Sequence, residues 1–166
     1  MSLPDNIIIT DAPFSPEDEF ARFRAGLTNA GAMVTFTGIV RDRAASTEGA
    51  NTVTALQLQH YPGFTEKQIS IFAQLATERF EINKFLIVHR VGTMTPSDPV
   101  VMVAVAAVHR RAAFEAADFL MDYLKTSAPF WKKEVRGTQS VWIEPRTADY
   151  TDIARWDAQN DTRDET

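Results

Sequence analysis

A nearly unbroken run of valine, methionine and alanine over residues 100–108 constrains the fold of this chain more than any other segment. A short apolar run this rich in β-branched residues is typical of a strand that is covered on both faces. The chain must therefore place layers of structure on either side of a sheet. With 166 residues it is long enough to bury such a core within one domain.

Three helices are expected from apolar residues at helical spacing. The first begins at Ser15, with a proline at the first helical position and acidic residues after it, and Gly31 is its expected end. The second begins with a capping box, Thr65-Glu-Lys-Gln68. The third is expected over residues 112–125, and Pro129 must end or interrupt it. Its predicted buried stripe consists of Phe114, Ala117, Leu120, Met121 and Leu124.

Strands are expected over residues 32–38, 53–61, 85–91, 100–108 and 138–143. In chain order with the helices, these segments read α-β-β-α-β-β-α-β. That order predicts an α+β layered domain and not a doubly wound parallel sheet. The polar residues 41–52 predict a mobile loop, and Trp131 and Trp142 are expected in the core.

The chain is expected to consist of one domain, residues 1–144, and an acidic polar C-terminal tail, residues 145–166. Residues 144–166 carry three Lys and Arg residues against seven Asp and Glu residues. Only Tyr150, Ile153 and Trp156 are apolar enough to anchor this tail.

The absence of cysteine excludes disulfides, thiolate nucleophiles, persulfide carriers and cysteine-ligated zinc. The three histidines are widely spaced, so no metal site is expected, and His60 and His89 are interpreted as structural. No glycine-rich nucleotide-binding motif is present, and no cofactor is expected.

The overall charge of −5 argues against general nucleic-acid binding. No apolar run reaches the roughly 18 residues that a membrane span needs, so no membrane association is expected. The N-terminus lacks the basic and apolar regions of a signal peptide. A cytoplasmic location is therefore expected.

Basic residues nevertheless gather at three points, each beside an apolar segment. Lys125 ends the third helix, and Lys132 and Lys133 follow a Pro-Phe-Trp turn. A second cluster, residues 109–111, follows the valine-rich run, and a third, residues 41–43, follows the first strand. If these points meet, they form a pocket that holds an anion while a lysine acts on it.

Each of these residues also has a plainer interpretation. Lys125 can serve only to complement the helix macrodipole, and Lys132 and Lys133 can be a solvated pair. His109 and Arg110 can be a half-buried histidine and a structural ion pair. Arg41 can form a salt bridge with a neighbouring carboxylate, from Asp42 or Glu48.

Five sequence blocks, in order and with matching spacing, resemble the large, catalytic subunit of molybdopterin synthase. The resemblance covers residues 31–144, and its most specific block is Met121-Asp-Tyr-Leu-Lys-Thr-Ser-Ala-Pro-Phe-Trp-Lys-Lys-Glu134. The other blocks are residues 36–41, 59–67, 88–92 and 108–116.

This resemblance implies an α/β hammerhead fold with an additional antiparallel β subdomain. It implies a sulfurtransferase that converts cyclic pyranopterin monophosphate into molybdopterin by installing two sulfurs as a dithiolene. The sulfur would come from the thiocarboxylated Gly-Gly terminus of a small ubiquitin-like subunit. Two copies of the large subunit would form a homodimer within a heterotetramer.

The resemblance also implies roles for particular residues. Lys125 and Lys132 match the catalytic lysine positions. Ile39 stands where relatives often carry lysine, so backbone or packing contacts are expected there. The implied substrate-binding residues are Ile39, Val40, Arg41, His109, Arg110, Lys125, Lys132, Lys133 and Glu134.

Two other function classes remain open on the sequence alone. A non-catalytic module that docks a ubiquitin-like tail would need the same surface without the chemistry. A phosphate-ester hydrolase is the weaker alternative, because the sequence offers no plausible metal site or nucleophile.

Overall fold

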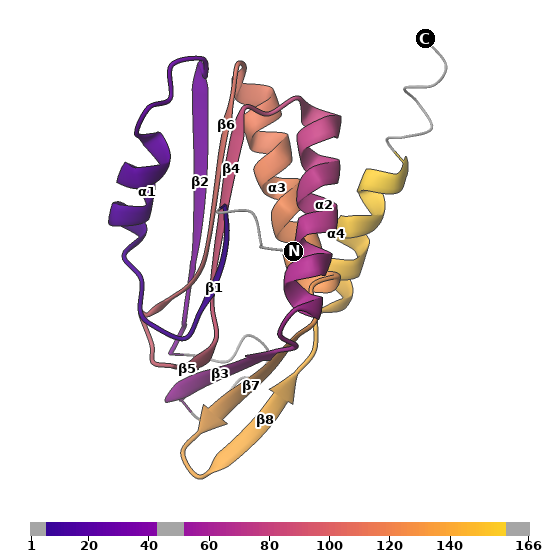
Figure 1. Cartoon of the computed structure of the whole chain (residues 1–166). Coiled ribbons are helices and arrows are strands. Elements are labelled where there is room, and N and C mark those ends of the chain that lie inside the picture. The colour runs from indigo at the N-terminus through magenta and orange to yellow at the C-terminus, as the bar shows by residue number, and fades with distance from the viewer. Residues whose placement is uncertain (1–5, 43–51, 159–166) are drawn as a thin grey trace.

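A four-stranded sheet with helices on both faces forms the body of the molecule (Figure 1). The computed structural model describes residues 6–42 and 52–158. The strand order is β1-β4-β6-β2, with β1 parallel to β4 and the other pairs antiparallel. These strands are β1 (Ile7–Thr10), β2 (Ala32–Ile39), β4 (Lys84–Arg90) and β6 (Pro99–Ala107).

Strand β6 is the buried strand that the valine-rich run predicts. Its residues alternate between two apolar clusters, so that Val103 and Val105 face one layer while Met102 and Ala104 face the other. All four side chains are at most 1% exposed. Both faces of β6 are therefore covered, as expected from its sequence.

The helices lie on opposite sides of this sheet (Figure 1). One side carries α1 (Pro16–Arg24), and the other carries α2 (Phe64–Phe80) and α3 (Arg110–Thr126). A fourth helix, α4 (Thr147–Ala158), packs on α3. Among the described residues, no helix has the length and apolar character that crossing a bilayer requires.

A second, wholly antiparallel sheet stands at one end of the first (Figure 1). Its order is β5-β3-β7-β8, formed by β3 (Ala55–His60), β5 (Gly92–Met94), β7 (Phe130–Arg136) and β8 (Gln139–Ile143). The two sheets meet where His89 of β4 stacks on Phe130 of β7, with ring centroids 3.9 Å apart. The predicted α+β class and the additional antiparallel β subdomain are confirmed.

The structure contains four elements that the sequence did not predict: β1, β5, β7 and α4. The residues interpreted as a turn with two lysines lie mostly in β7, because residues 130–135 pair with β3. Within the segment predicted to be a polar tail, Thr147–Ala158 form α4, in which Trp156 is 3% exposed and Ile153 packs against the core. The predicted loop over residues 41–52 falls mainly on residues 43–51, which lie outside the described residues.

Helix boundaries show where the local signals were right and where they were wrong. Ser15 caps α1 as predicted, accepting a hydrogen bond from the Asp18 N–H, but α1 ends at Arg24 and not near Gly31. The capping box predicted at Thr65 is not formed: α2 is capped at Gly63, which has no side chain to bond, and only Glu66 contributes by accepting from the Gly63 N–H.

Three aromatic residues expected to be buried are exposed. Phe114 on α3 is 62% exposed, because Ala113 and Ala116 face the sheet in its place. Trp131 and Trp142 are 49% and 57% exposed, since both lie on the outer face of the second sheet. The prediction that these side chains belong to the core is wrong.

Candidate active site

Three basic side chains from separate segments come together where the two sheets meet. Arg41 follows β2, Lys125 lies in the last turn of α3, and Lys132 lies in β7. Pro129 ends α3 shortly after Lys125 and lets the chain turn into β7. The charges of Lys125 and Arg41 both act on the Lys132 ammonium. The fold therefore builds a cationic cluster, defined here as Arg41, Lys125 and Lys132.

Lys132 is the most desolvated member of the cationic cluster. It stands opposite Leu58 of β3 and Ile143 of β8, on the inner face of the second sheet. Burial lowers the pKa of Lys132, and the charges of Lys125 and Arg41 add to this effect. The carboxylates of Glu134 and Asp149 act in the opposite direction without cancelling it. Because its pKa is lowered, more of Lys132 is present as the free amine at a given pH, and the free amine can accept a proton.

Lys125 is paired with an aspartate that the sequence analysis did not select. Its Nζ lies 3.7 Å from Oδ1 of Asp149, near the start of α4. The Asp149 side chain is buried, while the Lys125 side chain is 49% exposed. Asp149 also accepts hydrogen bonds from the backbone N–H and the guanidinium of Arg146, at 2.8 and 3.1 Å.

Burial of the Asp149 carboxyl would raise its pKa, but its partners reverse that effect. The hydrogen bonds from Arg146 and the charges of Lys125 and Arg146 hold the pKa of Asp149 below its usual range. Asp149 is therefore a carboxylate at neutral pH. The only sequence signal for Asp149 is its place as an acidic residue at the third position of a short helical pattern.

Lys133 and Glu134 have different surroundings from Lys132, although they are adjacent in sequence. Lys133 lies on the outer face of the second sheet, with its Nζ 5.3 Å from the centre of the Trp142 ring. Glu134 returns to the inner face and pairs with Arg136 at 2.6 Å.

Ile39 and Val40 precede Arg41 and differ in burial. Ile39 is 57% exposed, while Val40 is 5% exposed and packs with Leu56, Leu58 and Met94. The Val40 N–H donates to the Asp98 carbonyl, and the Ser97 N–H donates to the Val40 carbonyl. Val40 thus fixes the backbone that carries Arg41 into the cluster.

His109 and Arg110 stand apart from the cationic cluster within one chain. His109 caps the start of α3, whereas Lys125 lies at its end. At 1.5 Å per residue, Arg110 and Lys125 are about 22 Å apart along the helix axis. Both His109 and Arg110 are exposed. A single chain brings together Arg41, Lys125 and Lys132 but not His109 or Arg110.

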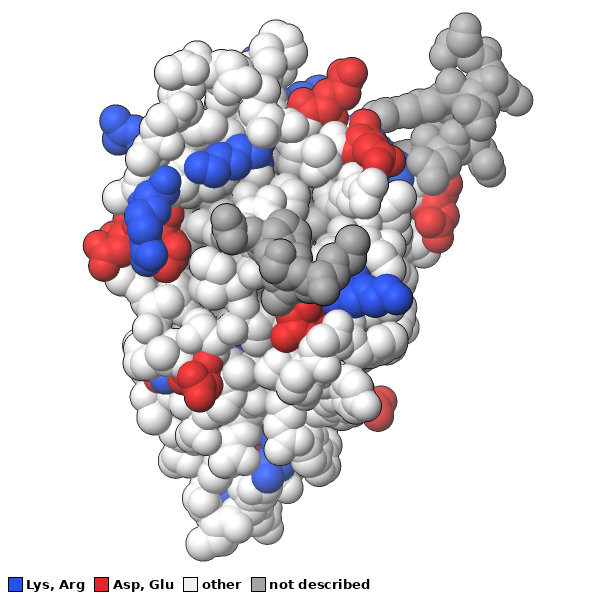
Figure 2. Space-filling model, viewed as in Figure 1, with Lys and Arg blue, Asp and Glu red and all other residues white. Residues whose placement is uncertain are grey.

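Charge is otherwise dispersed on the face shown in Figure 2, where Lys and Arg side chains are scattered among Asp and Glu. No group of three or more His, Asp or Glu side chains that could hold a metal ion occurs within residues 6–42 and 52–158. The lysine and arginine side chains of the cationic cluster can bind an anion through charge-assisted hydrogen bonds.

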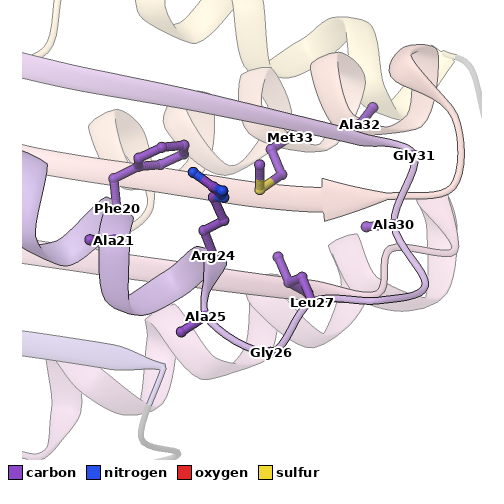
Figure 3. Close-up of a pocket in the computed structure, with 10 residues that line it drawn as sticks. All are labelled: Phe20, Ala21, Arg24, Ala25, Gly26, Leu27, Ala30, Gly31, Ala32 and Met33. Atoms are coloured by element: carbon purple, nitrogen blue, oxygen red, sulfur yellow. The ribbon is translucent and has the colours of Figure 1, made fainter.

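A separate hollow of about 620 Å³ lies between α1 and the start of β2 (Figure 3). Nine of its ten lining residues are glycine or apolar, including Phe20, Leu27 and Met33, and the Arg24 guanidinium lies among them. No member of the cationic cluster lines it. This hollow and the cationic cluster thus occupy different parts of the molecule.

The chain matches known proteins along most of its length. Residues 9–127 match the family described as MoaE protein. The molybdopterin synthase catalytic subunit of Caulobacter vibrioides is 48% identical over 153 residues, covering 92% of this chain and 98% of that protein.

Solved structures give the same result. The molybdopterin biosynthesis MoaE protein from Burkholderia ambifaria superposes with a TM-score of 0.75 at 42% identity, covering 91% of this chain and 97% of that one. A chain from the complex of subunits 1 and 2 of the molybdopterin-converting factor of Helicobacter pylori shares the fold, with a TM-score of 0.70 at 17% identity over 84% of this chain and 91% of that one.

Proposed function

Because the chain belongs to the MoaE family of molybdopterin synthase catalytic subunits, enzymes of molybdenum cofactor biosynthesis, we propose that its cationic cluster is the site of dithiolene formation. The substrate in this proposal is cyclic pyranopterin monophosphate. The observation that carries it is the convergence of Arg41, Lys125 and Lys132 at the junction of the two sheets.

The sulfur donor in this proposal is a partner protein. The chain contains no cysteine, so it has no thiol on which to carry sulfur. The Helicobacter pylori relative is found in a complex with its other subunit, which supports a similar pairing here. We take the partner to be a small ubiquitin-like subunit whose C-terminal Gly-Gly ends in a thiocarboxylate.

The three cations have different roles in this reaction. Arg41 holds the phosphate through its planar guanidinium. Lys125 and Lys132 stabilise the negative charge that develops when the thiocarboxylate sulfur bonds to a substrate carbon and a carbon–oxygen bond at that carbon breaks, so that the oxygen leaves with the electron pair. Water then cleaves the acyl–sulfur bond, so the partner leaves with an ordinary carboxylate. Lys132, whose pKa is lowered by burial, is suited to move the proton.

In this proposal, His109 and Arg110 of a second copy of the chain complete the site. They are exposed at the far end of α3 and cannot reach Lys125 of their own chain. A homodimer within a heterotetramer would let each chain supply these two residues to its partner's site. The remaining implied substrate-binding residues border the substrate site or shape it through packing: Lys133, Glu134, Ile39 and Val40.

Reconstitution with three components tests the proposed function. The purified chain, a thiocarboxylated small subunit and the cyclic phosphate are mixed, and dithiolene product is measured. Product formation supports the enzyme, while tail binding without product would favour a docking module. Release of phosphate without sulfur incorporation would favour a hydrolase. Cytoplasmic location belongs to the same proposal, and fractionation of cells that express the tagged chain tests it.

A further inference from the structure

The C-terminal helix α4 is attached to one face of α3 through a row of charged residues. Asp118, Asp122 and Lys125 are spaced four and three residues apart, so they lie on the same side of α3. Arg155 of α4 donates hydrogen bonds to Asp118 and Asp122, each at 2.7 Å. The third residue of the row, Lys125, pairs with Asp149, which like Arg155 belongs to α4.

Apolar contacts hold the far end of α4 firmly. Trp156 packs edge-to-face on Phe80 and Phe119, with ring centroids 5.7 and 5.4 Å apart. Its indole N–H donates to Asp122 at 2.7 Å. These contacts fix α4 on the body of the protein independently of Asp149.

Asp149 makes two kinds of contact that can be separated chemically. Its hydrogen bond from the Arg146 N–H stabilises the start of α4, and an asparagine could accept the same bond. Its ion pair with Lys125 needs the negative charge. Asp149 is 7% exposed, so its carboxylate is held in place beside the cationic cluster.

We propose that Asp149 is a positioning residue that holds the Lys125 ammonium within the cationic cluster, so that the first turn of α4 contributes to the site. This inference rests on the proposed function of the cationic cluster. A lysine side chain that is half exposed and unpaired would move among many rotamers. At 3.7 Å the contact is an ion pair and not a hydrogen bond, so the ammonium donors of Lys125 remain available to the substrate.

The same carboxylate affects the balance of charge at Lys132. The charged groups acting on Lys132 are Glu134, Lys125, Arg41 and Asp149, and the two carboxylates both favour its protonated form. Removing the charge of Asp149 therefore lowers the pKa of Lys132 further. This effect gives the proposal a second readout that a purely structural contact would not produce.

The test compares Asp149→Asn with Arg155→Gln in the reconstituted enzyme. In Asp149→Asn we expect kcat to fall about tenfold, because Lys125 is no longer held in place. We expect KM to stay level or fall, since an anionic substrate meets one negative charge fewer. The acidic limb of the pH–rate profile, which follows formation of the free amine of Lys132, should move to lower pH. Arg155→Gln loosens α4 at a distance from the site and should change kcat less than about twofold.

A measurement without turnover separates this inference from the proposed function. The pH dependence of acetic anhydride labelling at Lys132, followed by mass spectrometry, should shift to lower pH in Asp149→Asn and stay unchanged in Arg155→Gln. If the parent enzyme is active but Asp149→Asn keeps its kcat and its pH profile, the inference is wrong. Equal losses of kcat in both variants, without a labelling shift, would also overturn it. If the parent makes no product, the proposed function fails, and the labelling result still decides whether Asp149 acts on the cluster.

Discussion

Lys132 lies directly opposite Leu58 across the β3–β7 ladder, so a basic side chain occupies a position that the pleat directs inward. Leu58 is 6% exposed and belongs to the small core beneath the second sheet. Placing an ammonium group at this position costs free energy and lowers the pKa of Lys132. A buried ionisable residue whose pKa is shifted in this way is typical of a functional site.

Lys132→Ala should reduce dithiolene formation by about 100-fold, because the site loses both a proton carrier and a charge. Lys132→Arg restores the charge but remains protonated at working pH. We expect the arginine variant to keep substrate affinity while kcat remains low. Steady-state kinetics measures both constants, and full recovery of kcat in Lys132→Arg would contradict proton transfer by this residue.

Lys125→Ala should cost at least about 100-fold in rate, equivalent to about 2.7 kcal/mol of barrier. The reason is the loss of the ammonium that faces the developing negative charge. The rate is measured with the partner subunit at saturating concentration, and binding of the partner is measured separately. A loss under about threefold, with the partner still bound, would contradict the role of Lys125.

The buried imidazole of His89 should make the protein less stable in mild acid. Burial lowers the pKa of His89 from 6.5 to about 4, despite its hydrogen bond to the Arg90 carbonyl. Between about pH 4 and pH 6.5, His89 is therefore protonated in the unfolded chain and neutral in the folded chain. Stability is expected to fall across this window, by about 2 kcal/mol between pH 7.5 and pH 5.

Urea unfolding at the two pH values measures this effect. His89→Gln removes the titrating group, so the difference in stability between pH 7.5 and pH 5 should shrink by about 2 kcal/mol. The variant itself is expected to be less stable at pH 7.5, because the stacking on Phe130 is lost. An unchanged pH difference would show that another group is responsible.

Gly31→Ala should destabilise the fold by about 1–3 kcal/mol. A Cβ at this position would lie 2.4 Å from the Val108 carbonyl oxygen, and backbone cannot move aside cheaply. Gly38→Ala is the matched comparison, because its Cβ would meet side-chain atoms and no backbone, the nearest being from Val101 at 2.8 Å. Thermal unfolding of both variants should show the larger loss for Gly31→Ala, and a smaller loss there would contradict the steric explanation.

The sequence predicted the main elements well where one physical signal dominated. The valine-rich run gave β6, and Ser15 with its proline and acidic residues gave the start of α1. The edge strands β1 and β5 are short and carry weak patterns. Strand β7 was missed because Lys132 and Glu134 occupy inward-facing positions where a strand pattern requires apolar residues.

The candidate site was predictable in its residue types and only partly in its geometry. The spacing of basic residues beside apolar segments indicated Arg41, Lys125 and Lys132, and the fold brings these together. No local pattern could show that α3 separates His109 from Lys125 by its whole length. Asp149 lies in a segment whose polar composition suggested a tail, because the Trp156 contacts that dock α4 are tertiary.

The most direct test of a shared cationic site is complementation between two inactive variants. His109→Ala and Lys125→Ala chains are purified separately, then mixed under conditions that allow subunits to exchange, with the sulfur-donating partner present. A mixed dimer contains one site with both residues intact, so random exchange should restore about one quarter of wild-type activity. Dithiolene formation no higher than that of either variant alone, with mixed dimers demonstrated by mass, would contradict a site built from both copies.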